Sequence, residues 1–150
     1  MLTPPSISVA SVVERDGLFL FVEETVKSRL VINQPAGRLE AGESLIHAAV
    51  RETLEETGWH IEPQGLVGIY RWTSAREGKA YVRVCFHGQA LQHDAQRPLD
   101  AGIVRALWMD HATLLRREQE LRTPLVLRCL NDYLAGRRFP LDLLVDIAQD

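Results

Sequence analysis

Several features that would assign the chain to a particular class of protein are missing from its 150 residues. Lysine and arginine together number 17 against 20 aspartate and glutamate residues, so there is no basic surplus to hold a long nucleic acid by its phosphates. The longest obvious apolar run, LFLFV at residues 18–22, is far too short to cross a bilayer. We therefore expect no nucleic-acid partner and no membrane association.

Cysteine is scarce as well. The two cysteines, Cys85 and Cys129, lie far apart and match no metal-binding spacing, and we interpret them as reduced, buried thiols. The first ten residues, MLTPPSISVA, lack the charged and apolar regions of a secretory signal. These absences predict a cytoplasmic protein.

The composition that remains is typical of an ordinary globular domain. It is 46% hydrophobic and 25% charged, with a formal net charge of -3 and a pI near 6.0. No repeat, low-complexity segment or linker interrupts the chain. We predict a single domain over residues 1–150, large enough for a real core, and leave open whether it is a monomer or a homodimer.

Hydrophobic patterning and turn residues predict mostly strands. Strand-like runs cover residues 7–13 and 18–24, and the Asp16-Gly17 pair between them is typical of a hairpin turn that needs positive φ at both positions. Further strands are predicted at residues 30–33, 66–73, 80–91 and 103–108.

Three helices are predicted from their start and stop signals. They cover residues 44–57 between Ser44 and Gly58, a short segment capped by Asp110, and a segment that begins at Thr123-Pro124 and ends at Gly136. One early helix and late helices among strands predict an α/β (α+β) fold, with a mixed β-sheet packed between helices.

The first predicted helix carries a cluster of acids. Glu52, Glu55 and Glu56 form a stripe next to the apolar stripe that would pack on the sheet, and carboxylates three or four residues apart repel each other. A glycine-rich segment, PAGRLEAGE at residues 35–43, precedes the helix, and its first three residues are predicted as a turn. Clustered hard oxygen ligands suit Mg²⁺, which would convert the repulsion into attraction. The alternative is a solvated acidic face.

The segment from Gly37 to Trp59 follows a longer pattern: Gly, five residues, Glu, seven residues, Arg-Glu, two residues, Glu-Glu, one residue, Gly and a bulky apolar residue. This pattern resembles the signature of the Nudix hydrolase family. Seven fixed identities would coincide by chance on the order of once in 10⁸ trials. One position departs, because Thr53 stands where an aliphatic residue is usual, although its methyl group can still pack on the sheet. The fixed positions are Gly37, Glu43, Arg51, Glu52, Glu55, Glu56 and Gly58.

The resemblance implies a Nudix-type α/β/α sandwich and a Mg²⁺ site, with Mn²⁺ as a possible substitute. Its implied catalytic and metal-binding residues are Glu52 and Glu56 as main ligands, Glu55 as a further ligand, and the backbone carbonyl of Ala36 or Gly37. Glu52 is also a candidate general base, although the family often draws its base from outside this motif. Structural support of the motif is implied for Glu43, Arg51 and Gly58, of which Glu43 and Arg51 are expected to pair.

More of the chain resembles one branch of the family, bacterial phosphatases. The resemblance is carried by NQPAGRLEAGESL and TPLVLRCLNDYLAGRRFPLDLL and covers most of residues 7–145. It implies hydrolysis of nucleoside tri- and diphosphates, and of the pyrimidine diphosphate intermediate of thiamine synthesis, with release of orthophosphate. One alternative is a Nudix pyrophosphohydrolase acting at the α-phosphorus of oxidised nucleotides or dinucleoside polyphosphates. Others are a non-catalytic nucleotide-binding module and an RNA 5′-end hydrolase, the last disfavoured by the acidic balance.

Candidate substrate-binding residues are Gln34, Arg71, Trp72 and Arg83. Gln34 comes just before the predicted turn, and the other three lie on strand runs that would border the cleft. A base can stack on Trp72, and an arginine can bind a phosphate with two parallel hydrogen bonds. The alternative is a tryptophan at the edge of the core and arginines on the surface.

Overall fold

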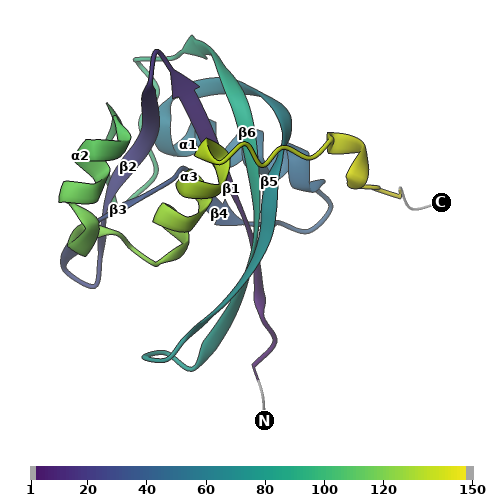
Figure 1. The fold of residues 1–150 in the computed structure, drawn as a ribbon, viewed down its shortest axis with the longest axis horizontal. Helices are drawn as coiled ribbons and strands as arrows, with labels where there is room; N and C mark the ends of the chain where they lie inside the picture. The colour runs from purple at the N-terminus through teal and green to yellow at the C-terminus, as the bar shows by residue number, and fades with distance from the viewer. Residues whose placement is uncertain (1–2, 148–150) are drawn as a thin grey trace.

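The structure, a computed structural model, describes residues 3–147. Along these residues the elements are β1 (Ser6–Arg15), β2 (Leu18–Val26), β3 (Arg29–Asn33), β4 (Ala36–Arg38), α1 (Leu45–Thr57), β5 (Trp59–Ser74), β6 (Lys79–His93), β7 (Ile103–Met109), α2 (His111–Arg116) and α3 (Leu125–Leu134), with 3₁₀ turns η1 (Glu118–Glu120) and η2 (Leu141–Leu143) (Figure 1). None of the helices within this range is long and apolar enough to span a membrane.

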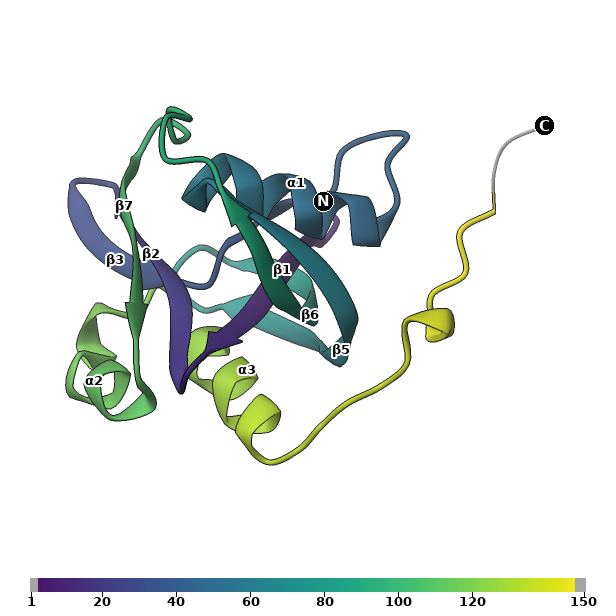
Figure 2. The same cartoon turned by 90° about the horizontal axis from the view of Figure 1, so that it is seen from above.

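The strands form a mixed sheet in the order β3-β2-β1-β6-β5, with β4 paired to β1 and β7 paired to β2. Strands β1 and β6 run parallel, and the other pairs are antiparallel. Helices α1 and α3 lie on opposite faces of this sheet (Figure 2). The predicted mixed sheet between helices is therefore confirmed.

The two faces of β1 show how the sequence builds both layers. Successive side chains of a strand point to opposite faces, and all of Val9, Ala10, Val12 and Val13 are buried. Val9 packs in a cluster with residues of α1, whereas Ala10 and Val12 pack in the cluster that holds the apolar side of α3. Residues 9–13 of β1 are therefore buried on both faces, and all but Ser11 are apolar.

Local signals predicted several element ends correctly. Ser44 caps α1 by accepting a hydrogen bond from the His47 N–H (3.1 Å), and Gly58 ends the helix at φ 75°. Asp16 and Gly17 both have positive φ in the β1–β2 hairpin. Thr53 is fully buried, and its hydroxyl donates to the Ala49 carbonyl (2.8 Å), which explains how a polar residue is accommodated there. Cys85 and Cys129 are buried free thiols, as predicted.

Three local predictions were wrong. Residues 35–37 do not make a turn, because Ala36–Arg38 pairs with β1 as β4. Strand β5 begins at Trp59 instead of residue 66, since Gly58 reverses the chain directly into a strand that pairs with β6 through bulges. Helix α3 begins at Leu125, although Thr123 Oγ1 still accepts a hydrogen bond from its N–H (3.2 Å).

Candidate active site

The free edge of β4 faces the acidic side of α1. The Ser11 N–H donates to the Pro35 carbonyl, and the Leu39 N–H donates to the Ile7 carbonyl (3.1 Å each). In this antiparallel register Gly37 exchanges hydrogen bonds with Val9 of β1, whereas the backbone groups of Ala36 and Arg38 point away from β1. Two of these outward groups meet α1.

The first of these contacts is from the Ala36 N–H, which donates to Glu56 Oε1 (2.9 Å). The second is from Arg51 Nη2, which donates to the Arg38 carbonyl (3.1 Å). The outward carbonyl of Ala36 lies on the same edge, next to the Glu56 carboxylate. The register therefore offers the Ala36 carbonyl, and not that of Gly37, as a ligand beside the acids.

Gly37 allows α1 to approach β4 closely. A Cβ atom at this position would lie 2.1–2.3 Å from the carboxyl atoms of Glu52. Its φ is not in the positive region, so the need is for space and not for an unusual backbone conformation. The position of the Glu52 carboxylate thus depends on the missing side chain of Gly37.

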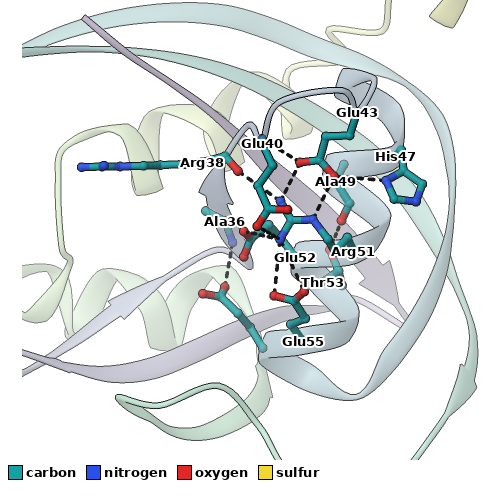
Figure 3. Close-up of polar contacts among 11 residues, drawn as sticks. Ala36, Arg38, Glu40, Glu43, His47, Ala49, Arg51, Glu52, Thr53 and Glu55 are labelled. Carbon is teal, nitrogen blue, oxygen red and sulfur yellow. Dashed lines mark hydrogen bonds and ion pairs between the residues drawn. The ribbon is translucent and has the colours of Figure 1, made fainter.

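Arg51 lies at the centre of the acidic residues (Figure 3). Its Nε and Nη2 donate to the two carboxylate oxygens of Glu43 (2.9 and 2.7 Å), so the pair predicted from the sequence is present. Its Nη1 donates to Glu52 Oε1 (2.9 Å) and more weakly to Glu55 Oε2 (3.3 Å). The Arg51 guanidinium holds the pKa of Glu43 down to about 2. Arg51 thereby orients two acids of the helix and fixes the preceding loop.

An acid from outside the motif, Asp100, joins Glu52 and Glu55, whereas Glu56 is not part of this group and accepts the Ala36 N–H. Oxygen atoms of Glu52, Glu55 and Asp100 all lie within 4.8 Å of one another. Asp100 is in the segment between β6 and β7, and its N–H donates to the Glu55 carbonyl (3.0 Å). No spacing in the sequence connects Asp100 with the helix, so sequence analysis did not find it.

The electrostatics of the cluster favour a bound cation. Burial raises the pKa of Glu56 to about 8, against the lowering effect of the Ala36 N–H, and the charges of Glu24, Glu52 and Asp100 raise it further. Burial also raises the pKa of Glu52 and of Asp100. Crowded carboxylates with raised pKa values are a donor set of hard oxygens that a divalent cation would stabilise in the ionised form. The residues present therefore fit a divalent metal ion.

A cavity of about 490 Å³ adjoins β4. Its wall includes residues of β4, the aromatic pair Trp72 and Tyr81, whose ring centroids lie 5.7 Å apart, and the start of α3. Among the lining residues that the structure describes, Glu77 is the one acid. The basic residues of the lining are Lys27, Arg29, Arg38, Arg76, Arg83 and Arg122.

Comparison with known proteins identifies the family. The family model of the NUDIX domain matches residues 2–128, most of the chain. The chain belongs to the Nudix family. Phosphatase NudJ of Escherichia coli K12 is 37% identical over 142 residues, which cover 95% of this chain and 92% of that protein. Like other Nudix hydrolases, this protein is an enzyme that hydrolyses phosphoric anhydride bonds.

Solved Nudix structures share the fold. A NUDIX hydrolase from Nitrosomonas europaea is 47% identical, with a TM-score of 0.94 over 96% of this chain and 98% of that one. The NUDIX domain of Shewanella oneidensis NrtR, solved with ADP ribose, is 18% identical, with a TM-score of 0.71 over 89% of this chain and 88% of that one. The predicted α/β/α sandwich of the Nudix type is thus confirmed, and the motif of residues 37–59 lies where β4 meets α1.

The four predicted substrate-binding residues occupy different places in this Nudix fold. Trp72 and Arg83 line the cavity. Gln34 is 1% exposed and lies behind Arg83, whose Nη1 donates to Gln34 Oε1 (2.9 Å). Arg71 is exposed on the face of β5 opposite to Trp72, so the structure does not bring it to the cavity.

Besides Asp100 in the acid cluster, several residues around the cavity were not predicted from the sequence. Asn33 accepts a hydrogen bond from Arg83 Nη2 (3.0 Å), and Tyr81 stacks on Trp72. Glu24 of β2 is 8% exposed and binds Arg122 of the cavity wall (2.8 Å). These residues come from elements distant in sequence, and no motif connects them.

Proposed function

We propose that this Nudix hydrolase is a Mg²⁺-dependent phosphatase of nucleoside tri- and diphosphates and of hydroxymethylpyrimidine diphosphate, and that it releases orthophosphate. The observation that carries the proposal is the acid cluster at the free edge of β4, next to a cavity with a basic lining. The similarity to proteins named Phosphatase NudJ supports release of orthophosphate. Mn²⁺ would substitute for Mg²⁺.

Glu52 and Glu56 are the proposed main metal ligands, with Glu55 as a further ligand. The carbonyl oxygen of Ala36, which points away from β1, would be one further ligand supplied by the protein. When bound, Mg²⁺ would neutralise charge on the leaving group and lower the pKa of a bound water.

The other proposed roles belong to residues that orient or exchange protons. Arg51 holds Glu52 and Glu55 in place through Nη1, while Glu43 fixes its other nitrogens. Asp100 is a stronger candidate than Glu52 for the general base, because Glu52 is hydrogen-bonded to Arg51 and Asp100 is exposed to solvent, where a proton can leave. The Trp72–Tyr81 pair offers an aromatic surface to a nucleobase.

We further propose that residues 1–150 form one Nudix domain that works in the cytoplasm on small molecules, as a monomer or a homodimer.

Product analysis with GTP and Mg²⁺ tests the proposed reaction. We expect GDP and orthophosphate, because the proposed phosphatase removes the terminal phosphate. GMP and pyrophosphate would instead establish attack at the α-phosphorus. Binding of GTP without any metal-dependent hydrolysis would favour a non-catalytic module. Hydroxymethylpyrimidine diphosphate, assayed in parallel, should also yield orthophosphate.

A further inference from the structure

Within residues 3–147, the buried positive charge of Arg83 has no carboxylate partner. Arg83 is 4% exposed in the cavity wall, and its Nη1 and Nη2 donate to the neutral side-chain oxygens of Gln34 and Asn33. Its Nε has no hydrogen-bond partner within residues 3–147. Burying an ionised group in this way costs free energy unless a bound anion neutralises its charge. Other arginines of the fold lie within 4 Å of a carboxylate, including Arg51, Arg105, Arg117, Arg122 and Arg128.

The residues around Arg83 hold its guanidinium in a fixed orientation. Gln34 Nε2 donates to the Val126 carbonyl of α3 (2.7 Å), so the amide that binds Arg83 is itself anchored. The Nε–H has no partner among residues 3–147 and is sealed from solvent, and each terminal nitrogen keeps a second N–H beyond its bond to Gln34 or Asn33. The remaining N–H groups of the two terminal nitrogens match two oxygen atoms of a phosphate.

A second basic residue lies near Arg83 on the same sheet face. Ser8 of β1 pairs with Arg38 of β4 on one side and with Arg83 of β6 on the other. Directly paired residues project to the same face, so Arg38 and Arg83 both face the cavity that they line. Figure 3 shows Arg38 pointing away from the acid cluster. The two basic side chains are therefore placed for a ligand group that lies beyond the acids.

The chemistry of the cavity specifies what that group is. The whole chain has a net charge of -3, yet six basic residues and one acid line this cavity. In a nucleoside diphosphate both phosphates flank the bond that is cleaved and lie at the acid cluster, so only the uncharged nucleoside extends into the cavity. A triphosphate cleaved at its end keeps a further phosphate, the α-phosphate, between the cleaved linkage and the nucleoside. We propose that Arg83 binds this non-scissile phosphate, so that the enzyme selects triphosphates over diphosphates. The inference rests on the proposed phosphatase function.

Kinetics of Arg83→Gln with GTP and GDP test the inference. The wild type should have a kcat/KM for GTP about 10- to 100-fold higher than for GDP, the range expected for a hydrogen-bonded ionic contact. Arg83→Gln should remove most of this preference, chiefly by raising KM for GTP, and should change kcat/KM for GDP less than about threefold. Arg83→Lys, which keeps the charge without the planar fork, should restore part of the preference. Arg116→Gln, an exposed arginine of α2, is the matched control and should leave both substrates unchanged.

An equal loss of kcat/KM for GTP and GDP in Arg83→Gln would overturn the inference, because Arg83 would then support the fold or bind the nucleoside. A second measurement needs only the wild type: inorganic triphosphate should inhibit GTP hydrolysis with a Ki about 10-fold or more below that of inorganic diphosphate. Equal inhibition, or equal efficiency with GTP and GDP, would overturn the phosphate assignment alone. Absence of metal-dependent hydrolysis of either nucleotide would overturn the proposed function as well.

Discussion

Glu56→Gln should lower kcat by about 100-fold or more and, in metal-free protein at pH 8, should raise the unfolding temperature. The loss of activity follows from removing a charged ligand of the proposed metal ion, since losing one such electrostatic contact costs about 10²–10³ in rate. The glutamine keeps an oxygen that can accept the Ala36 N–H, so the local structure should remain.

The gain in stability follows from the pKa of Glu56. Burial raises this pKa from 4.5 to about 8, so the folded state favours the neutral carboxyl. Below pH 4.5 Glu56 is neutral in both the folded and the unfolded state, and the folded state has its full stability. As the pH rises from 4.5 to about 8, the unfolded state gains the ionised carboxylate first, so the free energy of unfolding falls. Glutamine does not ionise, so the Glu56→Gln variant does not lose this stability as the pH rises. The variant should therefore gain up to a few kcal/mol over the wild type between these pH values, at about 1.4 kcal/mol for each pKa unit.

Thermal unfolding at pH 5 and pH 8, with EDTA and with Mg²⁺, measures both effects. The two proteins should be similar at pH 5, and the variant should be more stable at pH 8 with EDTA. Mg²⁺ should stabilise the wild type more than the variant, because only the wild type keeps all its ligands. A variant less stable than the wild type at pH 8 in EDTA would contradict the electrostatic account, and near-normal turnover in saturating Mg²⁺ would contradict the metal assignment.

Gly37→Ala should lower kcat on the order of 100-fold while changing the free energy of unfolding by less than about 1 kcal/mol. The new Cβ would lie 2.1–2.3 Å from the Glu52 carboxyl atoms, and that carboxylate is the mobile end of a flexible side chain. It can move away at little cost to the fold, but it then leaves the acid cluster. The backbone of Gly37 has no positive φ, so alanine introduces no strain there.

A double-mutant cycle with Glu52→Ala tests whether the effect acts through Glu52. If it does, Gly37→Ala should cost little activity once Glu52 has been truncated. Steady-state kinetics of the four proteins and their denaturant unfolding curves supply the data. Additive losses would show that Gly37 matters for another reason, and a large loss of stability in Gly37→Ala would show that the backbone and not the carboxylate gives way.

The sequence predicted those features that depend on neighbouring residues. Ser44 and Gly58 delimit α1 through hydrogen bonds within a few residues, and the Asp16-Gly17 turn needs only its own φ angles. The acid stripe and the Glu43–Arg51 pair follow in the same way from the helical repeat and the motif.

Features that depend on pairing between distant segments were not predicted. Residues 36–38 have the composition of a turn and become a strand because β1 offers them a partner edge. Asp100 reaches Glu52 and Glu55 because the chain returns past the end of α1 after β6. Arg71 was assigned to the cleft with Trp72, although adjacent residues of a strand face opposite sides.

Metal binding is the most direct test of the account. Crystals grown with Mn²⁺ and measured for anomalous scattering should show an ion in contact with carboxylate oxygens of Glu52 and Glu56 and with the Ala36 carbonyl, and EDTA should abolish hydrolysis. A map without an ion between these groups, together with a rate that EDTA leaves unchanged, would contradict the account.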